Sequence, residues 1–446
     1  MNRTEVVVIG GGLAGLFAAI ELAQRDVDVV VLEAAKDAGG VARSIVDSGY
    51  LLDAAVGSFV LPHPYLTPIL SRLGVELVQA DKCSRRRWVS HKQRLRVLPM
   101  GLKQLATSGL LGPVGKVRAV FEPLLGRGST SDDESLSEFL SRRFGRSAGQ
   151  TMSSLIASGV YAGDPELLSA ASSFPRLYGL ESESGSIVRA MLSARNNRPA
   201  DLAPPSLHAP VGGMASVVDS CVDVLGERLH TQTKVTKLER SEGQWTVESS
   251  KGSWTAEDVV VAVRPDQASG FLPKPVASTM SVARSAPVVV VGVGGRAADL
   301  PFPYGFGYLT MPGENLRTVG VIFESAMFPG RAPSGHRMAK VILGGSRNPY
   351  MVEWSDEQLA QIAVEELAWT LDQTLEASWL AVVRHRAGIP QYEIGHAARR
   401  AHTNRALEAY PGLRLIGWGY DGVAIADRAK EAVELADAIT GSNTVV

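Results

Sequence analysis

The sequence predicts an α/β protein in which a discontinuous Rossmann-type domain is combined with a β-rich domain and a mainly helical insert. Three stretches carry this prediction: the N-terminal stretch up to Glu33, the apolar run Asp258–Val263 and the C-terminal stretch from Leu413. The first and third have the order strand, glycine turn, helix, and the second has the composition of a buried parallel strand. Because the three are far apart in the sequence, we expect the Rossmann-type domain to be assembled from separate pieces of chain.

The N-terminal stretch has the order of elements of a dinucleotide-binding βαβ unit. The Val-rich run Glu5–Ile9 is followed by a glycine turn, by a helical segment to about Arg25 and by a second apolar run, Val27–Leu32, that ends on Glu33. Glycines permit the tight turn and the close approach of a pyrophosphate, and a carboxylate about 20 residues further on can bond a ribose. The helix N-terminus offers free N–H groups to the phosphates. The alternative is a glycine turn that binds no ligand.

A second glycine turn, Gly39–Gly40, follows, with Arg43 just beyond it. This arginine is well placed for the phosphates of a cofactor, although it could also be solvated. The segment Ile45–Leu52 is predicted to be one strand ending at Asp53. The small residues Ala54–Ser58 then indicate that the backbone approaches something flat or bulky.

The next part of the chain leads into a helical region. A short helix is expected at Tyr65–Leu73, and the strand-like Trp88–Leu98 alternates basic and apolar side chains. That alternation is typical of a solvated edge hairpin and equally of a rim that attracts an anionic ligand. Ser135 and Glu138 form the pattern of a capping box for a helix at Leu136–Phe144. Residues 195–210 are rich in proline and polar residues and are interpreted as a linker.

The second half of the chain returns to strands and ends on a helix. We expect a helix that opens within Val211–Met214 and runs to about Leu225, consecutive strands within 280–350 and an amphipathic helix at Asp356–Leu375. Further segments are predicted as follows: strands at Val235–Glu239, Trp245–Ser249 and Leu413–Ile416, and a final helix at about 427–440.

Composition excludes several classes of function. The 446 residues have a formal net charge of −1, so nothing suggests a nucleic-acid partner. The two cysteines, Cys83 and Cys221, are too few for a metal cluster, and we expect no disulfide. No apolar run reaches the roughly 18–20 residues of a membrane helix. We therefore expect a cytoplasmic protein in a reducing compartment, and peripheral contact with the inner face of the cell membrane stays open.

These motifs together resemble the flavoprotein amine-oxidase superfamily. The general marks are GGGLAG at 10–15, Glu33, the Gly39–Gly40 turn with Arg43, VGGM at 211–214 and the C-terminal GWGYDGVAIAD. Further marks resemble the protoporphyrinogen and coproporphyrinogen III oxidases of haem biosynthesis, and the similarity runs nearly from end to end. These are GVYAGDPELLS at 159–169, FP at 174–175, GFGYL at 305–309, MFP at 327–329, ILGGSR at 342–347 and IPQYEIGH at 389–396.

The resemblance implies FAD in an extended pose. The glycines would hold the pyrophosphate, Glu33 the adenosine ribose, and Val235 the adenine through its backbone. The C-terminal helix and His385 would lie near the flavin. The implied cofactor contacts are Gly10, Gly11, Gly12, Leu13, Ala14, Gly15, Glu33, Ala34, Gly40, Val41, Arg43, Ala55, Val56, Gly57, Ser58, Val235, His385, Val423, Ala424 and Ile425.

The resemblance also implies a cleft for a tetrapyrrole. Arg87 matches the family's carboxylate-binding arginine, and a guanidinium pairs well with a propionate. Leu309 and Ile342 match an apolar clamp on the rings, although the residues themselves are also compatible with a core. Gly159 matches a main-chain contact to a pyrrole.

The implied reaction is the six-electron oxidation of a porphyrinogen to a porphyrin, with O2 reduced to H2O2. The chemistry is the cofactor's, so no catalytic side chain and no metal ion is expected. Hand-over of the product to a ferrochelatase is a further expectation. The expected division is 1–80, 205–270 and 400–446 for the FAD-binding domain, 81–99 and 271–399 for the substrate-binding domain, and 100–204 for a helical insert that could face a membrane.

Two departures from the family pattern leave rival interpretations open. Relatives usually have Gly-Pro where this chain has Ala55–Val56, and Asn where it has Ala426 before Asp427. Either change could mark a diverged flavin oxidase or dehydrogenase for another polycyclic or amine substrate. A weakly active tetrapyrrole-binding paralogue is the third interpretation.

Overall fold

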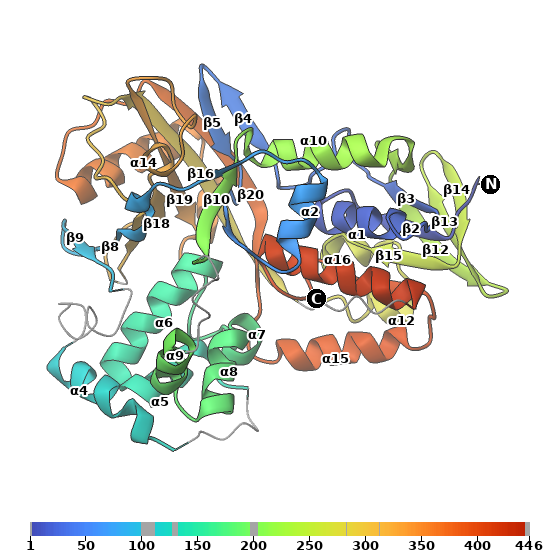
Figure 1. Cartoon of the computed structure of the whole chain (residues 1–446), viewed down its shortest axis with the longest axis horizontal. Helices are drawn as coiled ribbons and strands as arrows, with labels where there is room; N and C mark the ends of the chain where they lie inside the picture. Colours follow the sequence, from blue (N-terminus) through green and yellow to red (C-terminus); the bar gives the residue numbers. More distant parts are fainter. Residues whose placement is uncertain are drawn as a thin grey trace.

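The computed structural model describes residues 2–99, 112–126, 133–196, 204–281, 283–311 and 313–441. The elements form three parts, seen together in Figure 1: a parallel sheet with its helices, a larger mixed sheet, and a group of helices below it.

A five-stranded parallel sheet brings together the three stretches on which the fold prediction rested. Its strand order is β11-β3-β2-β15-β21, and every pairing in it is parallel. The side chains of β2 are buried throughout, as its unbroken run of β-branched residues predicts for a strand covered on both faces. This confirms the predicted α/β fold. The strands are β2 (Val6–Ile9), β3 (Val29–Leu32), β11 (Leu229–His230), β15 (Asp258–Val261) and β21 (Leu413–Leu415).

Helices cover one face of this sheet and a small antiparallel sheet covers the other. On the first face, α1 (Leu13–Ala23), α10 (Gly213–Leu225) and α16 (Ile425–Thr440) share one apolar cluster with the strands. On the second face a separate cluster joins the parallel sheet to the four-stranded sheet β1-β14-β13-β12. Its strands are β1 (Asn2–Arg3), β12 (Val235–Ser241), β13 (Gln244–Ser249) and β14 (Gly252–Ala256).

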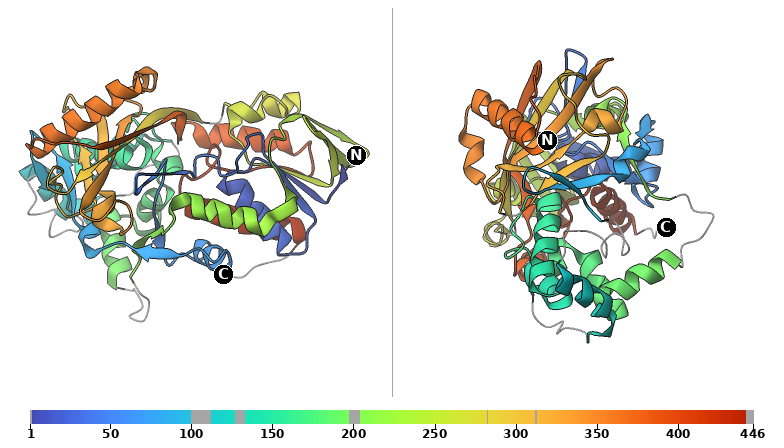
Figure 2. Two further views of the ribbon diagram at one scale, coloured as in Figure 1. Left: turned by 90° about the horizontal axis from the view of Figure 1, so that it is seen from above. Right: turned by 90° about the vertical axis from the view of Figure 1, so that its left-hand side faces the viewer.

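A seven-stranded sheet forms the second part, in the order β20-β16-β19-β18-β17-β8-β9. The pairing of β8 with β17 is parallel and the others are antiparallel. Helix α14 (Asp356–Leu371) packs on one face of this sheet, and Figure 2 shows it on the outside of the molecule. The strands are β8 (Arg87–Ser90), β9 (Leu95–Val97), β16 (Arg284–Arg296), β17 (Gly307–Thr310), β18 (Thr318–Ile322), β19 (His336–Gly344) and β20 (Trp379–Gln391).

The third part is helical. The capping box predicted for α5 is present, because Ser135 Oγ accepts from the Glu138 N–H and the Glu138 carboxylate accepts from the Ser135 N–H. A buried ion pair between Arg143 and Glu122 ties α5 to the turn after α4. The helices are α4 (Pro113–Phe121), α5 (Leu136–Phe144), α6 (Arg146–Tyr161), α7 (Ala170–Ser173), α8 (Pro175–Ser184) and α9 (Ile187–Asn196). None of the helices in the described ranges is both long and apolar enough to cross a membrane.

Local predictions failed where a turn or a pairing partner was overlooked. The single strand expected at Ile45–Leu52 is a hairpin of β4 (Ser44–Asp47) and β5 (Tyr50–Asp53). Its turn residues Ser48 and Gly49 both have positive φ, which suits a tight hairpin turn.

The linker expected at 195–210 was wrong at both ends, because α9 continues to Asn196 and Ser206–Pro210 forms strand β10 between β6 and β7. Its middle, 197–203, lies outside the described residues. The helix expected to reach Leu375 ends at Leu371, since Asp372 is left-handed. The remaining elements are β6 (Phe59–Leu61), α2 (Leu66–Arg72), β7 (Leu77–Gln79), η1 (Lys82–Arg85), η2 (Glu122–Leu124), η3 (Gly226–Arg228), α11 (Pro265–Ala268), α12 (Lys274–Ala277), α13 (Glu324–Met327), η4 (Pro349–Glu353) and α15 (His396–Leu407).

Candidate cofactor and substrate cavities

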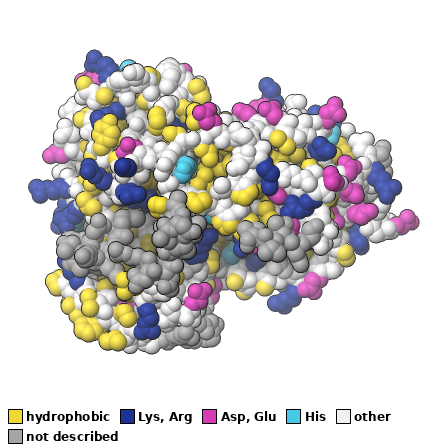
Figure 3. All heavy atoms as spheres, viewed as in Figure 1, with side chains coloured by type: hydrophobic (Ala, Val, Ile, Leu, Met, Phe, Trp, Pro, Cys, Tyr) yellow, Lys and Arg dark blue, Asp and Glu magenta, His cyan; other side chains and the backbone are white. Residues whose placement is uncertain are grey.

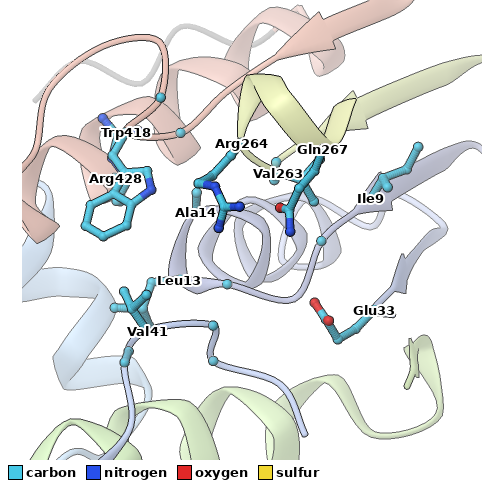
Figure 4. A pocket seen from close by; sticks show the side chains of 18 of the residues that line it. Ile9, Leu13, Ala14, Glu33, Val41, Val263, Arg264, Gln267, Trp418 and Arg428 are labelled. Atoms are coloured by element: carbon cyan, nitrogen blue, oxygen red, sulfur yellow. The ribbon is translucent and has the colours of Figure 1, made fainter. Parts of the chain in front are cut away.

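A cavity of about 610 Å³ lies across the carboxyl ends of β2, β3 and β15. This is the edge at which open parallel sheets bind ligands. Figure 4 shows the side chains of Glu33, Gln267, Arg264 and Trp418 around it, with Leu13 and Val41 facing them. The cavity is assembled from both ends and the middle of the chain.

The glycines of the first turn have two different functions in the packing. A Cβ on Gly15 would lie 2.0 Å from the carbonyl oxygen of Gly10, so this position lets α1 pack closely against the turn. A Cβ on Gly12, the N-cap of α1, would meet no protein atom within 4 Å and would project into open space at the cavity wall. The wall at Gly12 is therefore bare backbone beside a helix N-terminus, which fits a pyrophosphate.

Glu33 is fixed by two backbone donors. Its carboxylate oxygens accept hydrogen bonds from the N–H of Gly11 at 2.6 Å and from the N–H of Ala35 at 2.7 Å. The carboxylate lines the cavity, and two oxygens with about four acceptor positions leave capacity for ribose hydroxyls. The residues present thus fit a dinucleotide whose adenosine end lies at Glu33.

The segment 54–58, between β5 and β6, borders the same cavity through Val56. It is anchored on the opposite side by His385, whose Nε2 donates to the carbonyl oxygen of Ala54 at 2.7 Å. Burial lowers the pKa of His385, and the hydrogen bond to Ala54 opposes this effect. Asp53, directly before the segment, accepts from Arg331 at 2.7 Å and from the N–H of Met214 at 2.7 Å.

Thirteen of the twenty predicted cofactor residues line the cavity, and their roles stay predictions. Gly15 packs behind the turn, the Gly11 N–H bonds Glu33, and Arg43 is exposed outside the lining. Ala55, Gly57, Ser58 and His385 lie in or against the neighbouring segment. The residues that line the cavity are Gly10, Gly12, Leu13, Ala14, Glu33, Ala34, Gly40, Val41, Val56, Val235, Val423, Ala424 and Ile425.

Sequence reasoning missed several residues of this wall. Arg264 and Gln267 follow the end of β15, and Trp418 follows β21. Arg428 lies in the first turn of α16, where its guanidinium donates to the carbonyl oxygens of Asp421 and Gly422. Arg264, Gln267 and Trp418 could have been found from the rule that residues just beyond the carboxyl ends of adjacent parallel strands border the ligand. This rule does not reach Arg428, which lies on a helix.

A second cavity, of about 510 Å³, lies between α6 and the seven-stranded sheet. The four predicted substrate residues, Arg87 on β8, Gly159 on α6, Leu309 on β17 and Ile342 on β19, all line it. Its two long walls are apolar. Additional apolar residues, which the sequence did not single out, include Met152, Leu155, Ile156, Phe306 and Ile389.

Arg87 is the charged residue in the lining of this second cavity. Its guanidinium lies over the ring of Phe306, 4.4 Å from the ring centroid. Within the described residues it has neither a hydrogen bond nor a carboxylate partner, and burial lowers its pKa. Since arginine is charged at all physiological pH values, this is a half-buried cation that faces an apolar cavity.

The strand pattern explains why Leu309 and Ile342 face the cavity. Both are half-buried, whereas the neighbours of Ile342, Val341 and Leu343, are completely buried on the other face of the sheet. The side chain of Leu309 lies against the helix backbone, because a Cβ on Gly159 would be 3.1 Å from its Cδ1. The space between α6 and β17 therefore depends on the glycine.

The two cavities border one apolar cluster. Ile389 lines the second cavity and Val423 the first, and both pack against the cluster around Tyr161 and Tyr392.

Comparison with known proteins places the chain among flavoproteins. Residues 13–439 match the family model described as flavin-containing amine oxidoreductase. The coproporphyrinogen III oxidase of Bacillus subtilis (strain 168) is 27% identical over 98% of both chains. The chloroplastic protoporphyrinogen oxidase of Nicotiana tabacum is 30% identical over 98% of this chain and 85% of its own.

Solved structures show the same fold. A protein from Exiguobacterium sp. 255-15 superposes with a TM-score of 0.83 at 23% identity, over 98% of both chains. Cyclohexylamine oxidase from Brevibacterium oxydans IH-35A superposes with a TM-score of 0.71 at 17% identity, over 98% of this chain and 99% of its own.

Proposed function

Because the chain belongs to the flavin-containing amine oxidoreductases and, within them, to the protoporphyrinogen and coproporphyrinogen oxidases, we propose that it oxidises coproporphyrinogen III or protoporphyrinogen IX to the porphyrin. Its cofactor is FAD. The observation that carries the choice of substrate class is Arg87, which has no partner among the described residues and lies at an apolar cavity of about 510 Å³. A porphyrinogen combines an apolar macrocycle with propionate carboxylates, which are the groups that such a cavity would bind.

Each wall of the cavity has a part in this proposal. Arg87 pairs with a propionate, and the Phe306 ring beneath it holds the guanidinium in place. Leu309 and Ile342 contact the macrocycle from the sheet side. Gly159 lets the ring approach the backbone of α6. These contacts fix the orientation of the substrate and exclude water, which is what the protein contributes when the cofactor carries the chemistry.

The reaction balances without another co-substrate. Bound FAD supplies two-electron oxidation and passes the electrons to oxygen. One porphyrinogen and three O2 give one porphyrin and three H2O2, so six electrons and six protons leave the macrocycle.

A second candidate is a diverged flavin oxidase or a weakly active tetrapyrrole-binding protein. The observation that favours it is the presence of Ala55–Val56 and Ala426 where relatives usually have Gly-Pro and Asn. Val56 and Ala424 line the same cavity, so the departures lie close to the predicted flavin end.

The test is to mix FAD-loaded protein with anaerobically prepared coproporphyrinogen III and, separately, protoporphyrinogen IX, and then admit air. Porphyrin fluorescence should grow well above the autoxidation rate with at least one of them, and heat-denatured protein is the control. A rate equal to autoxidation with both substrates, from protein that retains its FAD, would reject the proposal in favour of the second candidate.

We also infer peripheral membrane contact through the helical part. An apolar stripe runs along α4 and η2 and is formed by Val114, Val117, Val120, Phe121 and Leu124. Val114 is 82% exposed and Leu124 78%. Figure 3 shows hydrophobic side chains gathered at this lower end of the molecule. Exposed apolar helix faces with basic residues nearby, here Lys116 and Arg118, are typical of proteins that bind lipid surfaces.

Sedimentation with anionic phospholipid vesicles tests this contact. We expect the protein to sediment with the vesicles and the variant Val117→Glu to do so much less. Val46→Glu is the matched control, because Val46 is 71% exposed on β4, outside the stripe. Equal binding by both variants would contradict the contact.

A further inference from the structure

A buried lysine that is not among the residues lining the cofactor cavity contacts the segment 54–58. Lys340, on β19, donates from Nζ to the carbonyl oxygen of Ala55 at 3.0 Å. One residue earlier, His385 on β20 donates to the carbonyl oxygen of Ala54 at 2.7 Å. Lys340 is 2% exposed and His385 8%. Two consecutive carbonyl groups are thus held by side chains of the seven-stranded sheet.

The direction of these carbonyls fixes the direction of the N–H groups that follow them. In a trans peptide the N–H points opposite to the C=O, and both peptides are trans because the cis bond of the described chain is Leu61–Pro62. The N–H groups of Ala55 and Val56 therefore point away from the seven-stranded sheet. Neither has a hydrogen-bond acceptor in the part of the chain that the structure describes. Val56 lines the cofactor cavity, and Ala55 directly precedes it in the chain.

The ion pair that holds Lys340 is not explained by stability. Lys340 Nζ lies 3.0 Å from Glu324 Oε1, and both side chains are buried. Glu324 Oε2 is buried and has no hydrogen-bond partner among the described residues. Buried ion pairs are commonly no more stabilising than apolar residues of similar volume, and an incompletely bonded carboxylate makes this pair less favourable still. The effect of the ion pair is to fix the Lys340 ammonium group at the carbonyl oxygen of Ala55.

We propose that Lys340 is a positioning residue which, together with His385, directs the N–H groups of Ala55 and Val56 at the flavin and so raises the reduction potential of the bound FAD. The inference rests on the flavin cofactor and is independent of the porphyrinogen substrate. N–H donors stabilise the electron-rich reduced flavin more than the oxidised flavin, because hydrogen bonds to a charged acceptor are stronger than those to a neutral one.

The variant Val56→Pro removes one of these donors and leaves the Ala55 carbonyl available to Lys340. Proline fits the family pattern at this position, where relatives usually have Gly-Pro. The matched control is Val56→Ala, which shortens the side chain and keeps the N–H. The measurement is the midpoint potential of the FAD-loaded protein, read from flavin absorption during slow reduction in the presence of a dye of known potential.

We expect Val56→Pro to weaken the preference for reduced over oxidised FAD about tenfold, which is about 30 mV for a two-electron couple. Val56→Ala should leave the potential unchanged. Equal potentials for the proline variant, the alanine variant and the wild type would overturn the proposal. Because no substrate is present, this outcome is distinct from a failure of porphyrinogen oxidation.

A second variant tests whether Lys340 acts through the segment. The double change Lys340→Met with Glu324→Gln removes the ion pair without leaving a lone buried charge. It should lower the potential like Val56→Pro, and adding Val56→Pro to it should have little further effect, since both changes remove the same interaction. An unchanged potential, or full additivity of the two effects, would overturn the role of Lys340. If the double variant does not fold, the comparison of the two Val56 variants still decides whether the donor contacts the flavin.

Discussion

The guanidinium carbon of Arg87 lies 4.4 Å from the centroid of the Phe306 ring, at the wall of a cavity whose other long faces are apolar. An aromatic face partly offsets the loss of hydration of a cation but leaves the donors of its fork available to a carboxylate. The arginine is therefore arranged as a single anchor for an anionic group on an otherwise apolar ligand.

Replacement of Arg87 by alanine should raise KM for a porphyrinogen about 10- to 100-fold, which corresponds to the roughly 1.5–3 kcal/mol of a charge-assisted hydrogen bond. The kcat should change much less, since the anchor lies on a substituent of the macrocycle. Arg96→Ala, an exposed arginine on the adjacent strand β9, is the control and should be neutral. Steady-state kinetics with both porphyrinogens check this, and an unchanged KM would refute the assigned role.

Replacement of Gly159 by alanine should separate substrate binding from stability. Alanine is favoured over glycine in a helix by about 1 kcal/mol, so the melting temperature should stay the same or rise. The new Cβ would lie 3.1 Å from Leu309 Cδ1 and narrow the cavity, so KM should rise several-fold. Gly179→Ala in α8 is the matched control, because its Cβ would meet only Glu183, at 3.7 Å. A loss of stability with unchanged KM would contradict the placement.

Replacement of Gly12 by alanine should weaken FAD binding without changing the apoprotein. Its backbone is extended, with φ −75°, and no protein atom lies within 4 Å of the added Cβ. The methyl group would occupy the space beside the helix N-terminus, so the Kd for FAD should rise at least about tenfold. Gly112→Ala is a close control, since Gly112 is also an N-cap with φ −66° and open surroundings.

Flavin fluorescence titrations measure the Kd for FAD of Gly12→Ala and Gly112→Ala, and thermal unfolding measures the stability of each apoprotein. An unchanged Kd for Gly12→Ala would show that the cofactor does not approach this turn.

His385 should make stability depend on pH in a predictable direction. Burial is the main cause of its lowered pKa in the folded protein, and the nearby Arg43 and Lys340 add to it. The unfolded chain takes up the proton near the ordinary pKa of about 6.5, whereas the folded protein does not. Stability contributed by neutral His385 is therefore present above this pH and is lost as the pH falls below it.

The measurement is urea unfolding of the wild type and of His385→Gln from about pH 8 to about pH 5. Glutamine keeps an N–H donor for Ala54 and does not titrate. The wild type should lose stability relative to the variant by up to about 1.4 kcal/mol per pH unit. The opposite slope would mean that His385 is charged in the folded protein.

The sequence predicted those parts of the fold that depend on local patterns. The apolar run at β15 predicted a buried parallel strand, and the order strand, glycine turn, helix predicted the βαβ unit that begins with β2. Ser135 with Glu138 predicted the start of α5. One cavity is lined by all four predicted substrate residues, Arg87, Gly159, Leu309 and Ile342, in agreement with the resemblance that singled them out. Their roles stay predictions.

Features that depend on contacts between distant segments were not predicted. In the sequence, Lys340 is one polar residue within an apolar strand. Its contact with Ala55 forms only when β19 packs against the segment after β5. Arg428 was missed although its partners, Asp421 and Gly422, lie in the loop just before its own helix. The turn at Ser48–Gly49, by contrast, could have been predicted, because a serine followed by a glycine is a turn signal in the sequence itself.

The most direct test of the proposed function is anaerobic mixing of the FAD-loaded protein with each porphyrinogen, followed by flavin absorption. We predict that coproporphyrinogen III or protoporphyrinogen IX bleaches the oxidised flavin band without oxygen, and that Arg87→Ala requires much higher substrate concentrations for the same rate. A flavin that stays oxidised with both porphyrinogens would contradict it.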